Sequence, residues 1–117
     1  MIAAVAAAAA DNQVFVAERA GTVVGCLHLV VTTDFFGLRH GHVSVLATTA
    51  AAEGTGVARE LMRHAEEWTR ARGLELLTLN MFARNERARR FYERAGFEPE
   101  MVKYSKEVNS QFPTSNS

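Results

Sequence analysis

Residues 51–62 read AAEGTGVARELM, and they place two glycines directly before a segment with helical periodicity. Glycines in such a position allow a tight turn, a close passage of two backbones, or the approach of an anion to main-chain N–H groups. The dipole of the following helix adds a partial positive charge at the same point. The stretch therefore predicts either an anion site or a packing contact, and the surrounding sequence must distinguish them.

The helix that follows these glycines is predicted over residues 56–72. Its apolar residues recur at three- and four-residue steps, and charged residues fill the opposite side. Gly73 is expected to end it in the left-handed conformation. Since strand-like residues 42–48 precede the helix and residues 74–82 follow it, we expect a crossover between neighbouring strands.

Two further strand patterns come earlier in the chain. Residues 14–18 and 22–32 flank a short turn signal at residues 19–21, which predicts an antiparallel hairpin. The second arm is apolar almost throughout, and Gly25 within it marks a bulge or a close backbone approach. The hairpin is followed by an expected loop over residues 34–41.

A second helix is predicted from Asn85, its N-cap, to Arg94, with a stop at Gly96. The residues that we expect it to bury are Ala88, Phe91, Tyr92 and Ala95. A final strand region is expected over residues 97–108, and residues 109–117 form a polar tail. The opening MIAAVAAAAA is predicted to be the end of a surface helix, because alanine favours helix. Residues 1–108 therefore form a single domain.

Composition and charge limit the classes of function. Of the 117 residues 48% are hydrophobic, enough for one domain with its own core. The 13 basic and 13 acidic side chains cancel, which argues against nucleic acid or an anionic membrane as the main partner. No apolar run reaches the roughly 20 residues of a membrane span. The single cysteine, Cys26, favours a reducing compartment, the cytoplasm, and is expected to pack in the core.

Several familiar motifs are absent around the glycines. A dinucleotide fingerprint needs a small residue where Arg59 stands, and a P-loop needs Gly-Lys-Ser/Thr. His40 and His42 form an i, i+2 pair without Cys, Asp or Glu at ligand spacing, so no metal site is predicted. The local pattern alone leaves both the anion and the packing interpretation open.

A second pattern, NERARRFYERAGF at residues 85–97, follows about 30 residues later. It places Asn85 at the mouth of a helix, with Ala88 and Tyr92 on successive turns of the same side. Together with EGTGVARELM, this motif resembles the acyl-CoA site of the GNAT superfamily of N-acetyltransferases. The resemblance covers about residues 14–108 and implies an α/β (α+β) fold, a GNAT-like mixed, mostly antiparallel sheet with flanking helices.

The resemblance implies acetyl-CoA as cofactor, entering between strands 42–48 and 74–82 where these splay apart. Its pyrophosphate would lie on the loop at residues 53–59, and a backbone N–H near residues 46–48 would stabilise the oxyanion. The cofactor-binding residues implied in this way are Leu46, Ala47, Thr48, Glu53, Gly54, Thr55, Gly56, Val57, Ala58, Arg59, Asn85, Ala88, Phe91 and Tyr92.

The implied reaction is direct attack on the thioester by a primary amine of a small molecule or peptide. Tyr92 matches the usual general acid for the leaving thiolate, with packing beside Phe91 as the alternative role. A carboxylate base is often found at the position of Ser44. His42, two residues earlier and expected on the same face, is the candidate base, unless it is only a solvated or capped side chain.

The sequence also departs from the family pattern. Glu53 stands where Gln or Arg is usual, and a carboxylate does not help to bind a pyrophosphate, although Arg59 could compensate. The N-terminal strand and helices of the family are largely absent, which would expose a sheet edge and an apolar face, so we expect a homodimer. A catalytically degenerate acyl-CoA-binding or protein-interaction module of the same fold is the alternative to an active enzyme.

Overall fold

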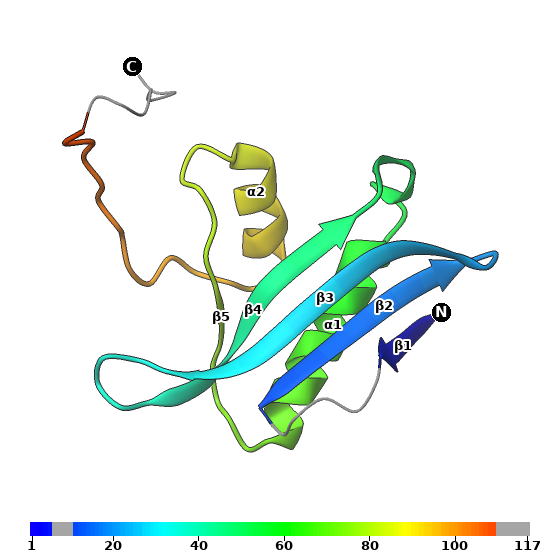
Figure 1. Ribbon diagram of the computed structural model, residues 1–117, viewed down its shortest axis with the longest axis horizontal. Helices are drawn as coiled ribbons and strands as arrows, with labels where there is room; N and C mark the ends of the chain where they lie inside the picture. The colour runs from blue at the N-terminus through cyan, green and yellow to red at the C-terminus, as the bar shows by residue number, and fades with distance from the viewer. Residues whose placement is uncertain (6–10, 110–117) are drawn as a thin grey trace. The chain divides into compact units, whose positions relative to one another are not determined.

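The computed structural model describes residues 1–5 and 11–109, and the chain divides into two compact units, Met1–Arg84 and Asn85–Ser117. The first unit holds a five-stranded sheet and a long helix (Figure 1). Its elements are β1 (Ile2–Val5), β2 (Asn12–Arg19), β3 (Thr22–Thr33), β4 (Arg39–Thr48), the short 3₁₀ helix η1 (Ala50–Ala52), α1 (Val57–Ala71) and β5 (Leu77–Leu79). The second unit holds α2 (Glu86–Arg94).

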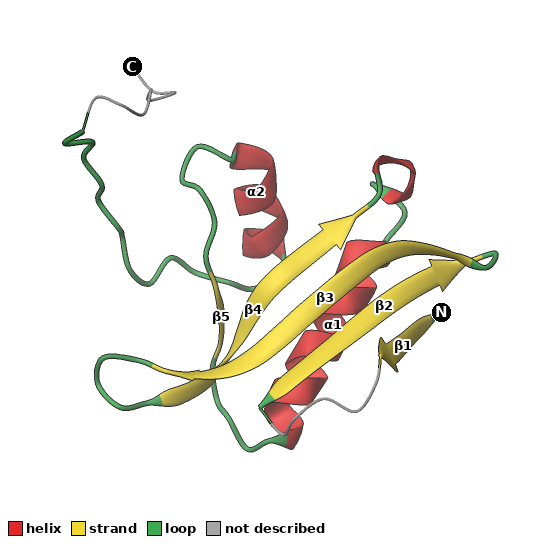
Figure 2. Ribbon diagram, viewed as in Figure 1, coloured by secondary structure: helices red, strands yellow, loops and turns green. Residues whose placement is uncertain are grey.

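The strands lie in the order β1-β2-β3-β4-β5 (Figure 2). The first three pairings are antiparallel, and β4 and β5 are parallel because α1 carries the chain across between them. Ala20 and Gly21 join β2 to β3 with φ angles of 52° and 80°, the left-handed conformation that a two-residue hairpin turn requires. The predicted hairpin, crossover helix and mostly antiparallel sheet are confirmed.

Helix α1 covers one face of the sheet and forms the core with it. Figure 1 shows the helix lying behind the strands. Leu27 and Leu29 of β3 are fully enclosed, as are Leu61 and Ala65 of α1. Each buried leucine contributes about 1.5–3 kcal/mol. The apolar stripe predicted from the helical periodicity is therefore the side of α1 that holds the first unit together.

Two sheet glycines fix the height of α1 above the strands. A Cβ added to Gly25 would lie 3.0 Å from Val57 Cγ1 and 3.1 Å from Leu61 Cδ1, at the start of the helix. At the other end, a Cβ on Gly41 would lie 2.5 Å from Thr69 Oγ1. The close approach predicted at Gly25 is confirmed, and a shift of register beside it leaves Val24 without a partner on β2.

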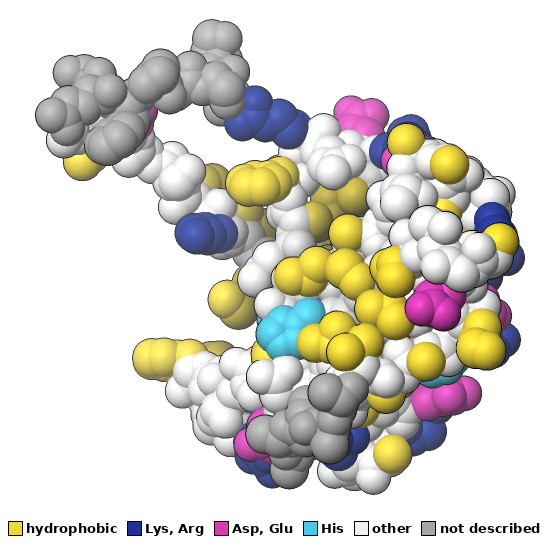
Figure 3. Space-filling model, turned by 45° about the vertical axis from the view of Figure 1, so that its right-hand side comes forward, with side chains coloured by type: hydrophobic (Ala, Val, Ile, Leu, Met, Phe, Trp, Pro, Cys, Tyr) yellow, Lys and Arg dark blue, Asp and Glu magenta, His cyan; other side chains and the backbone are white. Residues whose placement is uncertain are grey.

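The opposite face of the sheet is less enclosed. Val14 and Val16 of β2 and Cys26 and Val30 of β3 alternate with the residues that face α1, and all four keep partial exposure. Figure 3 shows hydrophobic side chains gathered around a histidine on this side of the sheet. Cys26, which was expected to pack in the core, is thus only half-buried.

Strand β5 is shorter than predicted, with three residues in place of residues 74–82. Its pairing with β4 ends at Val43 and Leu79. The next residue of β4, Ser44, has no partner on β3, because the register shifts between His28 and Leu29. A bulge bends a strand and increases its twist, which accounts for the loss of pairing at this point.

Other boundaries also differ. The expected loop at residues 34–41 is only residues 34–38, because Arg39, His40 and Gly41 already pair with β3. Ile2–Val5 forms strand β1 and not a helix, since pairing with β2 satisfies its main-chain groups and outweighs the weak helical preference of alanine. The remainder of that predicted helix, residues 6–10, lies outside the described residues, as do residues 110–117 of the tail. The strand predicted over residues 97–108 is wrong, because no described residue forms a ladder with it.

Helix α2 begins where predicted, after the N-cap Asn85. It buries none of its residues completely: Ala88, Phe91 and Tyr92 are half-buried, and Ala95 beyond its end is exposed. The burial expected from the sequence is therefore only partial. In the part of the chain that the structure describes, neither helix is long and apolar enough to cross a membrane.

Candidate functional site

The loop between η1 and α1 answers the question of why glycines precede the helix. Gly54 and Gly56 have φ angles of 78° and 89°, which side chains rarely tolerate. A Cβ at either position would meet nothing within 4 Å. The packing interpretation is therefore wrong for this pair, whose role is to set the conformation of an open loop.

The start of α1 presents unsatisfied main-chain donors. Gly56 is the N-cap and provides no capping side chain, and the first helical bond runs from the Glu60 N–H to the Gly56 carbonyl at 3.0 Å. Within the described part of the chain, five N–H groups have no acceptor, those of Gly54, Gly56, Val57, Ala58 and Arg59. Free N–H groups at the positive end of a helix dipole suit an anion.

Two carbonyls of η1 hold the loop, and the first, that of Ala50, accepts from the Glu53 N–H at 3.2 Å. The main-chain N–H and the hydroxyl of Thr55 both donate to the Ala52 carbonyl, the former at 3.2 Å. Ala52 is buried, so this anchor lies in the enclosed part of the first unit. Glu53 and Arg59 are both exposed at the two ends of the loop. The loop therefore carries one acidic and one basic side chain, and its free N–H groups lie between them.

The end of β4 carries a second set of main-chain N–H groups that have no acceptor among residues 1–5 and 11–109. Before the bulge, the N–H of Gly41 donates to the carbonyl of Leu76, just ahead of β5, at 2.9 Å. After the bulge, the N–H of Thr49 donates to the carbonyl of Val24 on β3, at 2.9 Å. Because donors alternate in direction along a strand, the N–H groups of Leu46 and Thr48 point away from β3, toward the side on which β5 pairs earlier. That of Ala47 points toward β3.

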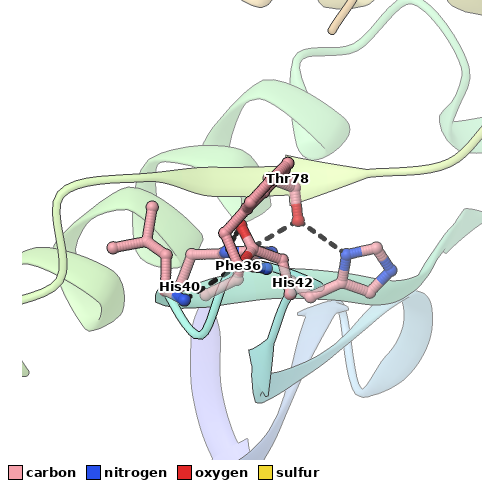
Figure 4. A network of polar contacts seen from close by, with 7 residues as sticks. Phe36, His40, His42 and Thr78 are labelled. Atoms are coloured by element: carbon pink, nitrogen blue, oxygen red, sulfur yellow. Dashed lines mark hydrogen bonds and ion pairs between the residues drawn. The ribbon is translucent and has the colours of Figure 1, made fainter. Parts of the chain in front are cut away.

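His42 lies where β4 and β5 are still paired. Its Nδ1 is 2.8 Å from the Thr78 Oγ1, and Thr78 also donates to the Gly41 carbonyl at 3.3 Å (Figure 4). Burial, and secondly the neighbouring His40, lower the pKa of His42 below its usual 6.5. A neutral imidazole at pH 7 is the form that a general base requires.

The expected relation between His42 and Ser44 stays a prediction. Ser44 is the extra residue of the bulge, so regular alternation does not by itself determine its face. Sequence reasoning missed Thr78. The only signal for it is the parallel register that sets Thr78 opposite His42, and that register depends on the paired structure.

His40 is buried beside the loop at residues 34–38. Among the residues that the structure describes, its Nδ1 has no hydrogen-bond partner, and it lies 4.0 Å from the Asp34 Oδ2. The other Asp34 oxygen accepts the N–H groups of Phe36 and Leu38, at 2.9 and 3.0 Å. Within residues 1–5 and 11–109, no three His, Cys, Asp or Glu residues come together as metal ligands. His40 therefore lies beside a loop-closing carboxylate and outside any such group.

The second unit places its predicted site residues on one short helix. The Asn85 Oδ1 accepts from the Ala88 N–H at 3.1 Å and so caps α2. The Tyr92 ring makes edge-to-face contacts with Phe91 and Phe97, with centroids 5.3 and 5.8 Å apart. Burial raises the pKa of the Tyr92 phenol above its usual 10, so the hydroxyl stays protonated at pH 7. This hydroxyl has no hydrogen-bond partner among the described residues, and it can donate a proton.

Comparison with known proteins adds independent information. Residues 3–97 match the Acetyltransferase (GNAT) family. Over 80 residues the chain is 39% identical to a mycothiol acetyltransferase of Propionibacterium freudenreichii subsp. shermanii, which corresponds to 68% of this chain and 25% of that protein. It is 37% identical over 81 residues to an uncharacterized N-acetyltransferase, YsnE, of Bacillus subtilis, or 65% of this chain and 53% of that protein.

Among solved structures, a candidate acetyl transferase from Pyrococcus furiosus has the same fold. It is similar with a TM-score of 0.79 at 24% identity, over 84% of this chain and 66% of that chain. The chain spans between a quarter and about half of the length of the two curated relatives. Because one family accounts for residues 3–97 and the sheet and crossover helix agree with it, this chain belongs to the GNAT acetyltransferase family.

Proposed function

We propose that this protein transfers an acetyl group from acetyl-CoA, the acyl donor of its family, to a primary amine of a small molecule or peptide. The observation that supports this most is the set of free N–H groups at the start of α1. A diphosphate ester carries the negative charge that such a helix terminus attracts, and the exposed Arg59 adds a cation beside it.

The proposed reaction is a direct acyl transfer. The amine nitrogen attacks the thioester carbonyl, the carbon–sulfur bond breaks, and the acetyl group ends on the amine as an amide. His42 accepts the proton that the amine loses, and the Tyr92 hydroxyl protonates the leaving thiolate. The N–H groups of Leu46 and Thr48, which are directed away from β3, are the candidates to stabilise the oxyanion.

The cofactor proposal is tested by comparing two ligands in calorimetry. CoA carries the diphosphate, whereas pantetheine shares the thiol arm but lacks it. We expect CoA to bind at least about tenfold more tightly, which corresponds to about 1.4 kcal/mol. Equal binding of the two ligands would contradict a role for the start of α1 in holding the diphosphate.

The transfer itself is tested by release of free thiol from acetyl-CoA, with a panel of amino sugars, polyamines and peptides as acceptors. Thiol release that depends on the amine supports the enzyme. CoA binding without release by any acceptor supports the alternative, a degenerate acyl-CoA-binding module. The exposed carboxylate of Glu53 at the proposed diphosphate loop is the observation that favours this alternative.

We also propose a cytoplasmic homodimer. Cys26 is a free thiol, which agrees with a reducing compartment. The strand order leaves β1 at one edge of the sheet, and open edges favour association. Sedimentation equilibrium over a range of protein concentrations tests the dimer, and a monomer at all concentrations would exclude it.

A further inference from the structure

We propose that Thr78 is a positioning residue, which holds His42 in the tautomer with its proton on Nδ1 and so makes Nε2 the atom that accepts a proton. The part played by Nε2 in catalysis rests on the proposed function. The tautomer itself does not, and it can be tested on the free protein.

The sheet brings the two side chains together. His42 of β4 and Thr78 of β5 are directly paired in the parallel register, and the Nδ1 to Oγ1 distance of 2.8 Å is that of a good hydrogen bond. The Thr78 hydroxyl also reaches the Gly41 carbonyl at 3.3 Å. Three groups therefore form a short chain from the imidazole to the main chain (Figure 4).

The number of available hydrogens decides which group donates in each of these two hydrogen bonds. A threonine hydroxyl has one hydrogen to donate, and both the Gly41 carbonyl and an unprotonated Nδ1 would compete for it. If Nδ1 carries the proton, it donates to Thr78, and Thr78 donates to Gly41, so that both contacts are hydrogen bonds. If Nε2 carries the proton, only one contact can be a hydrogen bond. The geometry therefore favours the proton on Nδ1.

The Gly41 carbonyl, which accepts the last of these hydrogen bonds, is held in place. The Gly41 N–H donates to Leu76 at 2.9 Å, and its Cα lies so close to Thr69 that no side chain would fit. The Gly41 carbonyl consequently cannot turn away without disturbing both β5 and α1. A rigid acceptor gives the Thr78 hydroxyl one preferred direction, which is what orients the imidazole.

The other ring nitrogen is available. The Nε2 of His42 has no hydrogen-bond partner in the described part of the chain, and Figure 4 shows the ring extending away from Thr78. The titratable group beside it is His40 on the same strand, which faces Asp34; on β3 the residue paired with His42 is the apolar Val30. The lowered pKa of His42 keeps the ring neutral, with a lone pair on Nε2.

The tautomer is measured by nitrogen-15 NMR of the histidine ring in the ligand-free protein, at a pH where His42 is neutral. His42→Gln assigns the signal. We expect the wild type and Thr78→Ser to show the proton mainly on Nδ1, and Thr78→Val, which keeps the shape but loses the hydroxyl, to shift toward the Nε2 proton. A wild-type ring protonated on Nε2, or no shift in Thr78→Val, would overturn the inference.

Kinetics provides the second measurement. Thr78→Val is expected to lower kcat about tenfold, as loss of an orienting partner does, with KM for acetyl-CoA unchanged. Thr78→Ser should restore kcat, and Thr22→Val, at the far end of β3, serves as the matched control. If transfer proceeds and Thr78→Val is as fast as the wild type, Thr78 has no positioning role. If no variant transfers acetyl groups but the tautomer responds to Thr78, the proposed function fails and the inference stands.

Discussion

The two helices begin in opposite ways. Helix α2 starts at Asn85, whose side chain caps the Ala88 N–H at 3.1 Å. Helix α1 starts at Gly56, which has no side chain, and its first N–H groups have no acceptor within the described residues. A capping side chain usually contributes about 1 kcal/mol. The longer helix thus lacks a stabilising feature that the shorter one has.

This difference separates two kinds of contribution to a site. At α1 the useful groups belong to the main chain, and the glycines keep space open in front of them. At α2 the main chain is closed by Asn85, and the useful group is a side chain, the Tyr92 hydroxyl. Substitution of one side chain should therefore abolish the role of α2, whereas the role of α1 should be sensitive chiefly at its glycines.

The largest expected effect comes from Tyr92→Phe. Loss of a general acid lowers rates by about a hundredfold or more, so kcat should fall by that factor while CoA affinity stays the same. Stopped-flow thiol detection and calorimetry measure the two quantities. Tyr104→Phe is the matched control, because Tyr104 is also in the second unit and is 91% exposed. Unchanged turnover in Tyr92→Phe would remove the side chain from the mechanism.

A smaller effect is expected from Gly56→Val. A β-branched residue in the left-handed conformation costs about 1–2 kcal/mol, so the loop should relax and its N–H groups diverge. CoA should then bind about tenfold more weakly. Gly73→Val, at the other end of α1 with a φ of 73° and open space around it, imposes the same strain away from the loop. An equal loss of affinity in both variants would show that strain alone is responsible.

The third prediction concerns the capped helix. Asn85→Ala should destabilise α2 by about 1 kcal/mol, because the Ala88 N–H loses its acceptor. Faster hydrogen exchange at Ala88 measures this. Asn85→Asp keeps an acceptor and should exchange as slowly as the wild type, while Asn80→Ala controls for loss of an amide elsewhere. If Asn85→Ala exchanges at the wild-type rate, the cap has no energetic role.

The smallest effect is a displacement of the pH profile. Because burial lowers the pKa of His42, the base becomes protonated only below pH 6.5, and kcat/KM should begin to fall only there. The raised pKa of Tyr92 places the alkaline limb above pH 10. His42→Gln should remove the acidic limb and leave the alkaline one. An acidic limb above pH 6.5, or one that persists in His42→Gln, would point to another base.

Periodicity predicted the local elements well and the partner-dependent ones poorly. Helix α1, the β2–β3 hairpin and the glycine loop follow from residues near one another in sequence, and the structure confirms them. The extent of β5, the strand at Ile2–Val5 and the contact between His42 and Thr78 depend on which strand lies beside which. A sequence pattern contains no such register, and it cannot reveal the bulge at Ser44 that ends the β4–β5 pairing.

That bulge also determines which residues of β4 direct their N–H groups away from β3. Ahead of Ser44 odd-numbered residues such as Gly41 send their N–H groups toward β5, and beyond it the even-numbered Leu46 and Thr48 do so. Because Ser44 is the extra residue, Val43 and Val45 pair with the consecutive residues Leu29 and His28, and the ladder with β3 keeps its alternation across the bulge. One residue can therefore be gained or lost at position 44 without reversing the later donors, whereas the same change further along β4 would turn them toward the opposite side.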